Sequence, residues 1–299
     1  MASDLAAGAE CWVPDRGDEG FVRAKLINLT AEEATVQAGG GQATHKVADV
    51  FPVNPSNQSG CKDNTELMYL REPHMLFNLK ERYRVDAIYT YTAHILIACN
   101  PFKRLQIYST EKMLAYAGKP LGVMEPHVFA VADRAFRQMA HYGQSQAVII
   151  SGESGSGKTE TAKVVMSYLT WSGGGDPKTK EKKGRKSFSD ISALAQRVLQ
   201  ANPLLESFGN ARTLRNDNSS RFGKFTKMLF GSAGAIEGAA VSTYLLEKSR
   251  LVTHAPGERG YHVFYELCAG ANKAQRAELK LLPARDYPFL FCDPEKEKA

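Results

Sequence analysis

Residues 152–159 read GESGSGKT and match the pattern G-x-x-x-x-G-K-[ST] without a mismatch. The apolar, β-branched stretch at 146–151 comes directly before the motif, and a helical pattern follows it to about residue 171. A strand, a glycine-rich loop and a helix in this order are the context in which the motif binds phosphate. We therefore expect an α/β fold with a phosphate-binding loop at the start of a helix.

The chemistry of this loop follows from its residue types. Small residues let successive backbone N–H groups converge on phosphate oxygens. Lys158 would add a point charge at the β and γ phosphates, and the Thr159 hydroxyl would be a ligand of Mg²⁺. Kinases, GTPases, helicases and motors share the motif, so it does not decide the reaction. The expected contacts of the loop are Gly152, Glu153, Ser154, Gly155, Ser156, Gly157, Lys158, Thr159 and Glu160.

The rest of the sequence divides into two parts. Short apolar stretches at 21–26, 34–37 and 45–50, separated by glycines and charges, predict a small all-β barrel over residues 8–55. From residue 60 onwards, strand and helix patterns alternate, which predicts an α/β domain. The expected strands are 93–99, 146–151, 225–230 and 239–246, and the expected helices are 128–142, 158–171, one from 191 and one opened by Asn202 and Pro203.

Composition excludes several classes of protein. The 299 residues are 43% hydrophobic and 23% charged, as in ordinary globular domains. Cysteines and histidines show no metal-ligand spacing, and no apolar run approaches the roughly 20 residues that cross a bilayer. Much of the net charge of +6 lies in a basic stretch at 178–186, within an expected surface loop at 172–190. Since no aromatic residues are interleaved with these charges, we expect no nucleic-acid partner, and we expect no transmembrane segment.

A second polar segment, NDNSSRFGKF at residues 216–225, narrows the choice. Together the two segments closely resemble the phosphate loop (GESGxGKTE) and switch I (NxNSSRFGKF) of myosins. The resemblance implies a P-loop NTPase core with a mixed central sheet flanked by helices. The resemblance further implies that this core is the N-terminal part of the motor domain, over residues 60–299, and that an SH3-like barrel over residues 8–55 precedes it. Further segments that look like the myosin head are 69–73, 89–91, 95–103, 202–206, 243–250 and 257–259.

The resemblance also places the adenine of ATP against the loop that follows residue 99. The face of a tyrosine and nearby backbone groups can hold the edge of a base. Without the resemblance, the same segment reads as a turn after a strand, with Tyr108 in the core. The residues implied around the adenine are Asn100, Pro101, Arg104 and Tyr108.

Hydroxyl and amide side chains suit a switch segment because they position charge and water without titrating. The resemblance implies that Ser220 and Thr159 ligate Mg²⁺ and that Ser219 lies close to the attacking water. Arg221 would pair with a glutamate of the family's switch II. The implied catalytic residues are Lys158, Ser219, Asn216 and Arg221, and the implied nucleotide contacts of the switch are Asn216, Asn218, Ser219 and Ser220.

The function that the resemblance implies is that of an actin-activated motor ATPase of the cytoplasm and cytoskeleton, with ATP and Mg²⁺ in its site. Actin filaments would bind the remainder of the motor, and calmodulin-like light chains would bind a lever. Because no acidic switch II segment (D-x-x-G-F-E) occurs in the 299 residues, we expect weak or no hydrolysis by this chain alone. Two alternatives remain open: a small-molecule or nucleotide kinase, and a non-catalytic nucleotide-binding module.

Overall fold

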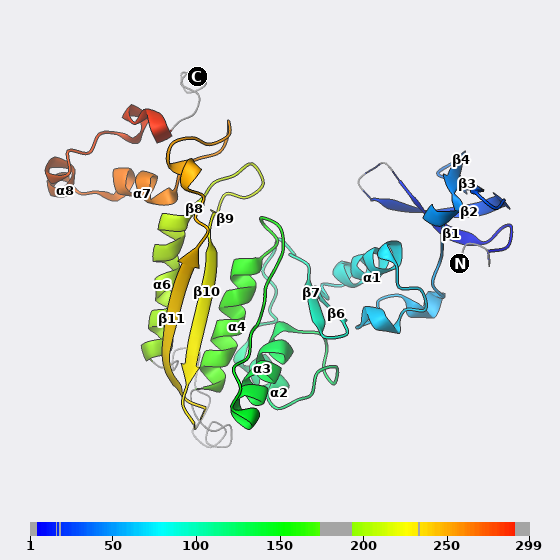
Figure 1. Ribbon diagram of the computed structural model, residues 1–299, viewed down its shortest axis with the longest axis horizontal. Helices are drawn as coiled ribbons and strands as arrows, with labels where there is room; N and C mark the ends of the chain where they lie inside the picture. Colours follow the sequence, from blue (N-terminus) through cyan, green and yellow to red (C-terminus); the bar gives the residue numbers. More distant parts are fainter. Residues whose placement is uncertain (1–4, 16, 18, 174–192, 233, 291–299) are drawn as a thin grey trace. The chain divides into compact units, whose positions relative to one another are not determined.

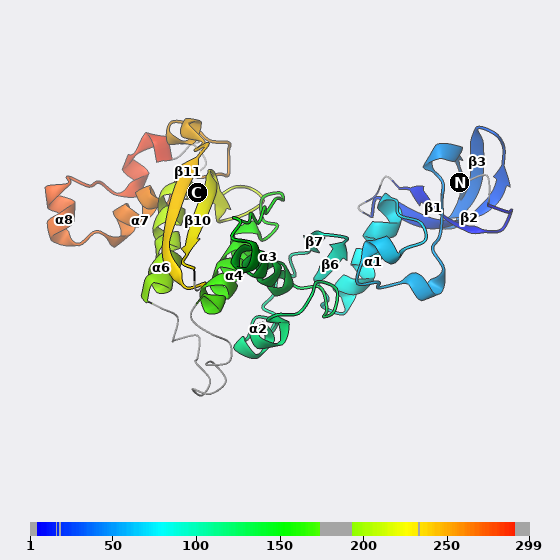
Figure 2. The same ribbon diagram turned by 60° about the horizontal axis from the view of Figure 1, so that its bottom comes forward.

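Figures 1 and 2 show the computed structural model, which describes residues 5–15, 17, 19–173, 193–232 and 234–290. The chain divides into two compact units. The first comprises Met1–Gln106 and Gly122–His127, and the second comprises Ile107–Leu121 and Val128–Ala299. The basic stretch at 178–186 and most of the loop expected at 172–190 lie outside the described residues. No helix in the described part of the chain has the length and apolar character needed to span a membrane.

The first unit begins with a five-stranded antiparallel sheet, blue in Figure 1, in the order β4-β3-β2-β1-β5. Alternate residues of its strands share a face, and that face builds a core that includes Val13, Leu26 and Val36. A turn of Gly39 and Gly40, both with positive φ, joins the third and fourth strands. The strands are β1 Glu10–Pro14, β2 Phe21–Leu29, β3 Glu33–Ala38, β4 Gly41–Lys46 and β5 Phe51–Pro52.

These strands confirm the expected β region, with one shift. The strand expected at 45–50 begins earlier, at Gly41, because the two-glycine turn allows pairing to start at once, with Ala38 opposite Gly41. It ends at Lys46, where Val47–Asp49 form a 3-10 turn. The extent of an SH3-like barrel over residues 8–55 stays a prediction.

A helix and a hairpin complete the first unit. Helix α1 spans Glu72–Arg84, and strands β6 (Tyr89–Thr92) and β7 (Ile95–Ala98) form an antiparallel pair. Arg82 of the helix donates to the Thr90 hydroxyl at 2.9 Å and to the Tyr89 carbonyl at 2.8 Å, which holds the hairpin beside α1 (Figure 2). The short 3-10 helices of this unit are η2 Val47–Asp49, η3 Ser56–Gln58 and η4 Asn64–Glu66.

The buried strand expected at 93–99 is therefore wrong in part. Ala93 has a positive φ of 53° and lies in the turn before β7. Ile95 is 66% exposed, so β7 is the outer arm of a hairpin and not a buried central strand. An apolar run of this length predicts burial, but it does not say how many neighbours the strand has.

The second unit contains the phosphate-loop helix. Helix α3 packs against α4 (Figure 1), and Phe129, fully buried, contacts the rings of Tyr116 and Tyr168. The helices are α2 Thr110–Tyr116, α3 Val128–Tyr142, α4 Lys158–Ser172, α6 Ala193–Gly209, α7 His262–Gly270 and α8 Lys273–Glu278. The strands are β8 Asn210–Ala211, β9 Ser219–Ser220, β10 Gly223–Phe230 and β11 Ile236–Tyr244, and the 3-10 helices are η6 Lys248–Leu251, η7 Ala284–Asp286 and η8 Pro288–Leu290.

The helices expected at 128–142 and 158–171 are confirmed, as are the strands expected at 225–230 and 239–246 within one to three residues. The strand expected at 146–151 is wrong. This segment is not a strand in the structure, and Ile149 is 89% exposed. A strand forms only where a neighbour offers backbone N–H and C=O groups, and no described segment does so here. Besides the N-terminal sheet, the described strands form three separate two-stranded sheets, β6–β7, β8–β9 and β10–β11.

Asn202 and Pro203 do not open a helix, contrary to expectation. Both lie inside α6, which is continuous from Ala193 to Gly209. A proline in a helix interior removes one N–H···O=C bond. Ending one helix and starting another would leave several carbonyls and N–H groups without helical partners. Continuing through the proline leaves fewer backbone groups unpaired.

Candidate functional site

The phosphate loop depends on glycines for its shape. Gly155 (φ 81°) and Gly157 (φ 94°) are in the left-handed region, which side chains disfavour. A Cβ on Gly152 would lie 2.5 Å from the Ser156 hydroxyl oxygen. Glycine at these positions therefore lets the loop curl before α4 without backbone strain.

The start of α4 has the properties of an anion site. The first N–H groups of a helix have no helical acceptor, and the helix dipole is positive at this end. No side chain caps the helix at Gly157. The Lys158 ammonium donates to the carbonyls of Gly152 at 2.6 Å and Glu153 at 2.7 Å, so its charge lies over the loop. Backbone donors, a positive helix end and one ammonium together fit a polyphosphate.

The switch segment lies against this loop. Strand β9 pairs with β8, with Ser219 opposite Ala211. Ser219 is 3% exposed, and its hydroxyl oxygen lies 2.9 Å from that of Ser154 in the phosphate loop. The structure thus brings together two motifs that are 65 residues apart in the sequence. Asn216 forms the preceding turn, in which its side-chain oxygen accepts from the N–H of Asn218 at 3.0 Å.

The side chain of Asn218 is held by neighbouring elements. Its amide oxygen accepts from Asn210 at 2.9 Å and from Nε2 of His262 at 3.1 Å. An amide oxygen only accepts, so Nε2 of His262 carries the proton in this contact. The amide nitrogen donates to Glu206 at 3.2 Å. These contacts brace the switch from α6, β8 and α7, and a contact of Asn218 with phosphate stays a prediction.

Arg221 has an acidic partner within the second unit. Its Nε donates to Oε2 of Glu247 at 2.5 Å, and Nε of Arg250 donates to the same oxygen at 2.8 Å. Burial opposes ionisation of Glu247, but the hydrogen bonds and charges of the two arginines outweigh it. The pKa of Glu247 therefore lies below its usual value.

Acid should weaken this cluster. The pKa of Glu247 is lower in the folded chain than in the unfolded chain. The ionised carboxylate therefore stabilises the fold fully above the ordinary carboxyl pKa of 4.5. This stabilisation is lost as pH falls through the lower folded pKa. Denaturation of the wild-type chain and of Glu247→Gln across this range should show a difference in stability that shrinks on acidification. A difference that stays constant or grows would contradict the assignment.

The family model of the myosin head (motor domain) matches residues 61–297. This chain belongs to the myosin head family. It is 46% identical over 274 residues to Myosin-7 of Arabidopsis thaliana and 44% identical over 302 residues to Unconventional myosin-VI of Bos taurus. These matches cover 91% and 97% of the chain but 15% and 22% of the two relatives. The chain therefore spans about a fifth of the length of the curated relatives that it matches.

The residues implied around the adenine are divided between the units of this myosin head chain. Asn100, Pro101 and Arg104 belong to the first unit, and Tyr108 belongs to the second. The Asn100 side chain accepts from the N–H of Phe102 at 2.9 Å. The ring of Tyr108 meets that of Phe129 edge-on, with centroids 6.2 Å apart. A joint contact of these residues with adenine stays a prediction.

The metal ligands implied by the myosin resemblance, Thr159 and Ser220, are hydroxyl residues. Among the described residues, no group of three or more His, Cys, Asp or Glu side chains could hold a metal ion. Mg²⁺ takes few protein ligands and otherwise keeps phosphate oxygens and waters. Coordination by Thr159 and Ser220 stays a prediction.

The residues that hold the switch of this myosin head were not predicted from the sequence. Glu206 and His262 contact Asn218, and Glu247 contacts Arg221. One signal was present: Glu206 and Glu247 each follow a pair of leucines, where a carboxylate needs a partner if it is buried. Nothing in the sequence named the partner.

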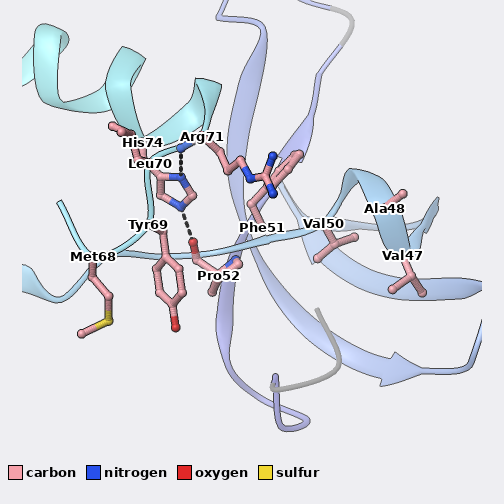
Figure 3. A pocket seen from close by; sticks show the side chains of 10 residues that line it. All are labelled: Val47, Ala48, Val50, Phe51, Pro52, Met68, Tyr69, Leu70, Arg71 and His74. Carbon is pink, nitrogen blue, oxygen red and sulfur yellow. Dashed lines mark hydrogen bonds between the residues drawn. The ribbon is translucent and has the colours of Figure 1, made fainter. Parts of the chain in front are cut away.

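A hollow in the first unit has the side chain of Arg71 among its lining residues. Its volume is about 510 Å³, and Figure 3 shows it lined mainly by apolar and aromatic side chains of β5, α1 and the segments before them. His74 accepts from the N–H of Arg71 at 3.3 Å and donates to the Pro52 carbonyl at 2.6 Å. Because Nδ1 accepts the hydrogen bond from Arg71, it carries no proton, and burial lowers the pKa of His74. The phosphate loop, with Lys158 over it and the uncapped start of α4 beside it, stays the candidate nucleotide site.

Proposed function

We propose that this chain is the nucleotide-binding part of an actin-based motor that couples Mg-ATP binding and hydrolysis to movement on actin filaments. The observation that carries the proposal is the 2.9 Å contact between the hydroxyls of Ser154 and Ser219. It joins the phosphate loop to the switch segment. A phosphate chain held by the loop would therefore act directly on a second segment.

Different residues of the chain bind the phosphates, orient the water and hold the metal ion in this proposal. The N-terminus of α4 and the Lys158 ammonium bind and orient the phosphates. The Ser154 and Ser219 hydroxyls can orient a water for in-line attack without changing their own charge. Thr159 and Ser220 would hold Mg²⁺, which would supply neutralisation of charge on the phosphate oxygens.

The switch segment is also connected to a longer element that could move with it. It continues through Arg221 into β10, which pairs with β11 along eight residues. A change at Ser219 can therefore reach a long, hydrogen-bonded hairpin. In the longer motor we propose actin filaments and calmodulin-like light chains as partners, with a place in the cytoplasm on the cytoskeleton.

The Mg²⁺ site can be tested with Thr159→Val, which removes the hydroxyl and keeps the shape. The wild-type chain should bind ATP more tightly in the presence of Mg²⁺ than in the presence of a chelator that removes Mg²⁺. In the variant we expect this gain to fall by about tenfold, the size of one lost ligand to a charged group. Displacement of a fluorescent nucleotide measures both affinities.

Thr161→Val is the matched control, because it makes the same change further along α4. Equal behaviour of the two variants would contradict the assigned ligand.

In the longer protein, actin filaments should raise the rate of phosphate release from ATP. Transfer of phosphate to an acceptor molecule would favour a kinase instead.

A further inference from the structure

Glu247 holds Arg221 at two points. The Glu247 carboxylate accepts from Nε of Arg221 at 2.5 Å. The Glu247 backbone N–H donates to the Arg221 carbonyl at 3.0 Å. Both the side chain and the main chain of Arg221 are therefore fixed by one residue that follows the end of β11.

Glu247 is itself anchored in the second unit. The Arg250 guanidinium, 4% exposed, donates to both of its carboxylate oxygens, at 2.8 and 3.3 Å. Arg250 also donates to Glu258 at 2.8 Å and to the Arg259 carbonyl at 3.0 Å. The Tyr261 hydroxyl donates to the Glu247 carbonyl at 2.7 Å. A buried charge with several fixed partners is a rigid support.

The chain of contacts continues to the phosphate loop. Nη1 of Arg221 donates to the Ser219 hydroxyl at 3.3 Å. The Ser219 hydroxyl lies 2.9 Å from that of Ser154. A continuous set of polar contacts therefore runs from Glu247 to the loop that precedes α4.

We propose that Glu247 is a positioning residue of the nucleotide site, which fixes Arg221 and, through it, the Ser219 hydroxyl opposite Ser154. This inference rests on the proposed function, since it concerns the same site. It assigns no contact between Glu247 and the nucleotide. Glu247 should affect the affinity for ATP more than the affinity for ADP, because the switch acts on the terminal phosphate in the proposed mechanism.

If only charge mattered, Glu247→Gln would strengthen ATP binding and not weaken it. Removing an acid leaves excess positive charge, which would attract phosphates and strengthen ATP binding. Glu258 serves as the matched control for this effect. It belongs to the same cluster, and its side chain is 16% exposed, but it forms its ion pair with Arg250 and not with Arg221. Glu258→Gln removes the same charge and leaves the link to Ser219 in place.

The test compares the affinities of the chain for Mg-ATP and Mg-ADP. Glu247→Gln should weaken ATP binding by about tenfold, as expected for one lost charge-assisted hydrogen bond, and change ADP binding by less than about twofold. Glu258→Gln should change neither by more than about twofold. Arg221→Gln should repeat the loss for ATP, and the double variant with Glu247→Gln should add nothing, because both changes break one link.

Hydrogen exchange gives a second readout that needs no hydrolysis. The amides of residues 216–221 should exchange faster in Glu247→Gln than in Glu258→Gln. Trp171 fluorescence, followed in a Trp12→Phe background, reports whether α4 remains folded. Equal losses for ATP and ADP, or equal effects of the two variants, would mean general loosening and would overturn the inference. Unchanged ATP affinity in Glu247→Gln would overturn it as well. Failure of the wild-type chain to bind Mg-ATP would reject the proposed function and this inference with it.

Discussion

Replacing Lys158 by alanine should weaken ATP binding to this chain by about ten- to a hundredfold. The ammonium lies over the loop, 2.6 and 2.7 Å from two of its carbonyls, and is the side-chain cation of the motif. A charge-assisted contact to phosphate is worth about 1.5–3 kcal/mol, and each 1.4 kcal/mol is tenfold in affinity. Equilibrium titration with a fluorescent ATP analogue measures the change.

Lys112→Ala is the control for this experiment. Lys112 is an exposed residue of α2 in the same unit, so the substitution removes the same charge away from the loop. Its ATP affinity should stay within about twofold of the wild type, because exposed charges at a distance are screened by salt. A Lys158→Ala chain that binds ATP like the wild type would contradict the assigned site.

Phe129→Ala should lower the free energy of unfolding of the second unit by about 3–5 kcal/mol. The side chain is fully buried, and its ring lies 5.1 Å from Tyr168 and 6.3 Å from Tyr116. Its removal leaves a cavity in the contact between α3 and α4. Because the latter helix begins at the phosphate loop, weaker packing here would also loosen the site.

Tryptophan fluorescence can isolate this unit. The chain has two tryptophans, and Trp171 lies 5.5 Å from Tyr168 in the same aromatic cluster. In a Trp12→Phe background, urea unfolding followed at Trp171 reports the second unit alone. Phe208→Ala, at a position 60% exposed, should cost less than about 1 kcal/mol. Equal losses at the two positions would contradict the assigned core.

Sequence patterns predicted elements that are set by local chemistry. The glycines and Lys158 predicted the loop, and the spacing of apolar residues predicted α3 and α4 close to their observed bounds. The strand at 146–151 failed because a strand depends on neighbours that its own residues do not specify. The helix start at Asn202 failed because a local stop signal was overridden by the continuous α6.

The candidate site was predictable in part for the same reason. Two motifs named both sides of the site, and the structure brings them together at Ser154 and Ser219. The supports of the switch were not predictable, because Glu247 pairs with Arg221 across 26 residues and His262 meets Asn218 across 44. Such pairings are properties of the fold and not of any local pattern.

Hydrogen exchange of the chain with and without Mg-ATP tests the central claim most directly. If residues 152–160 and 216–221 form one nucleotide site, the amides of both segments should slow together when the nucleotide is added. The hairpin of β3 and β4 serves as an internal reference and should not change. Protection confined to one of the two segments, or found only elsewhere in the chain, would contradict the account.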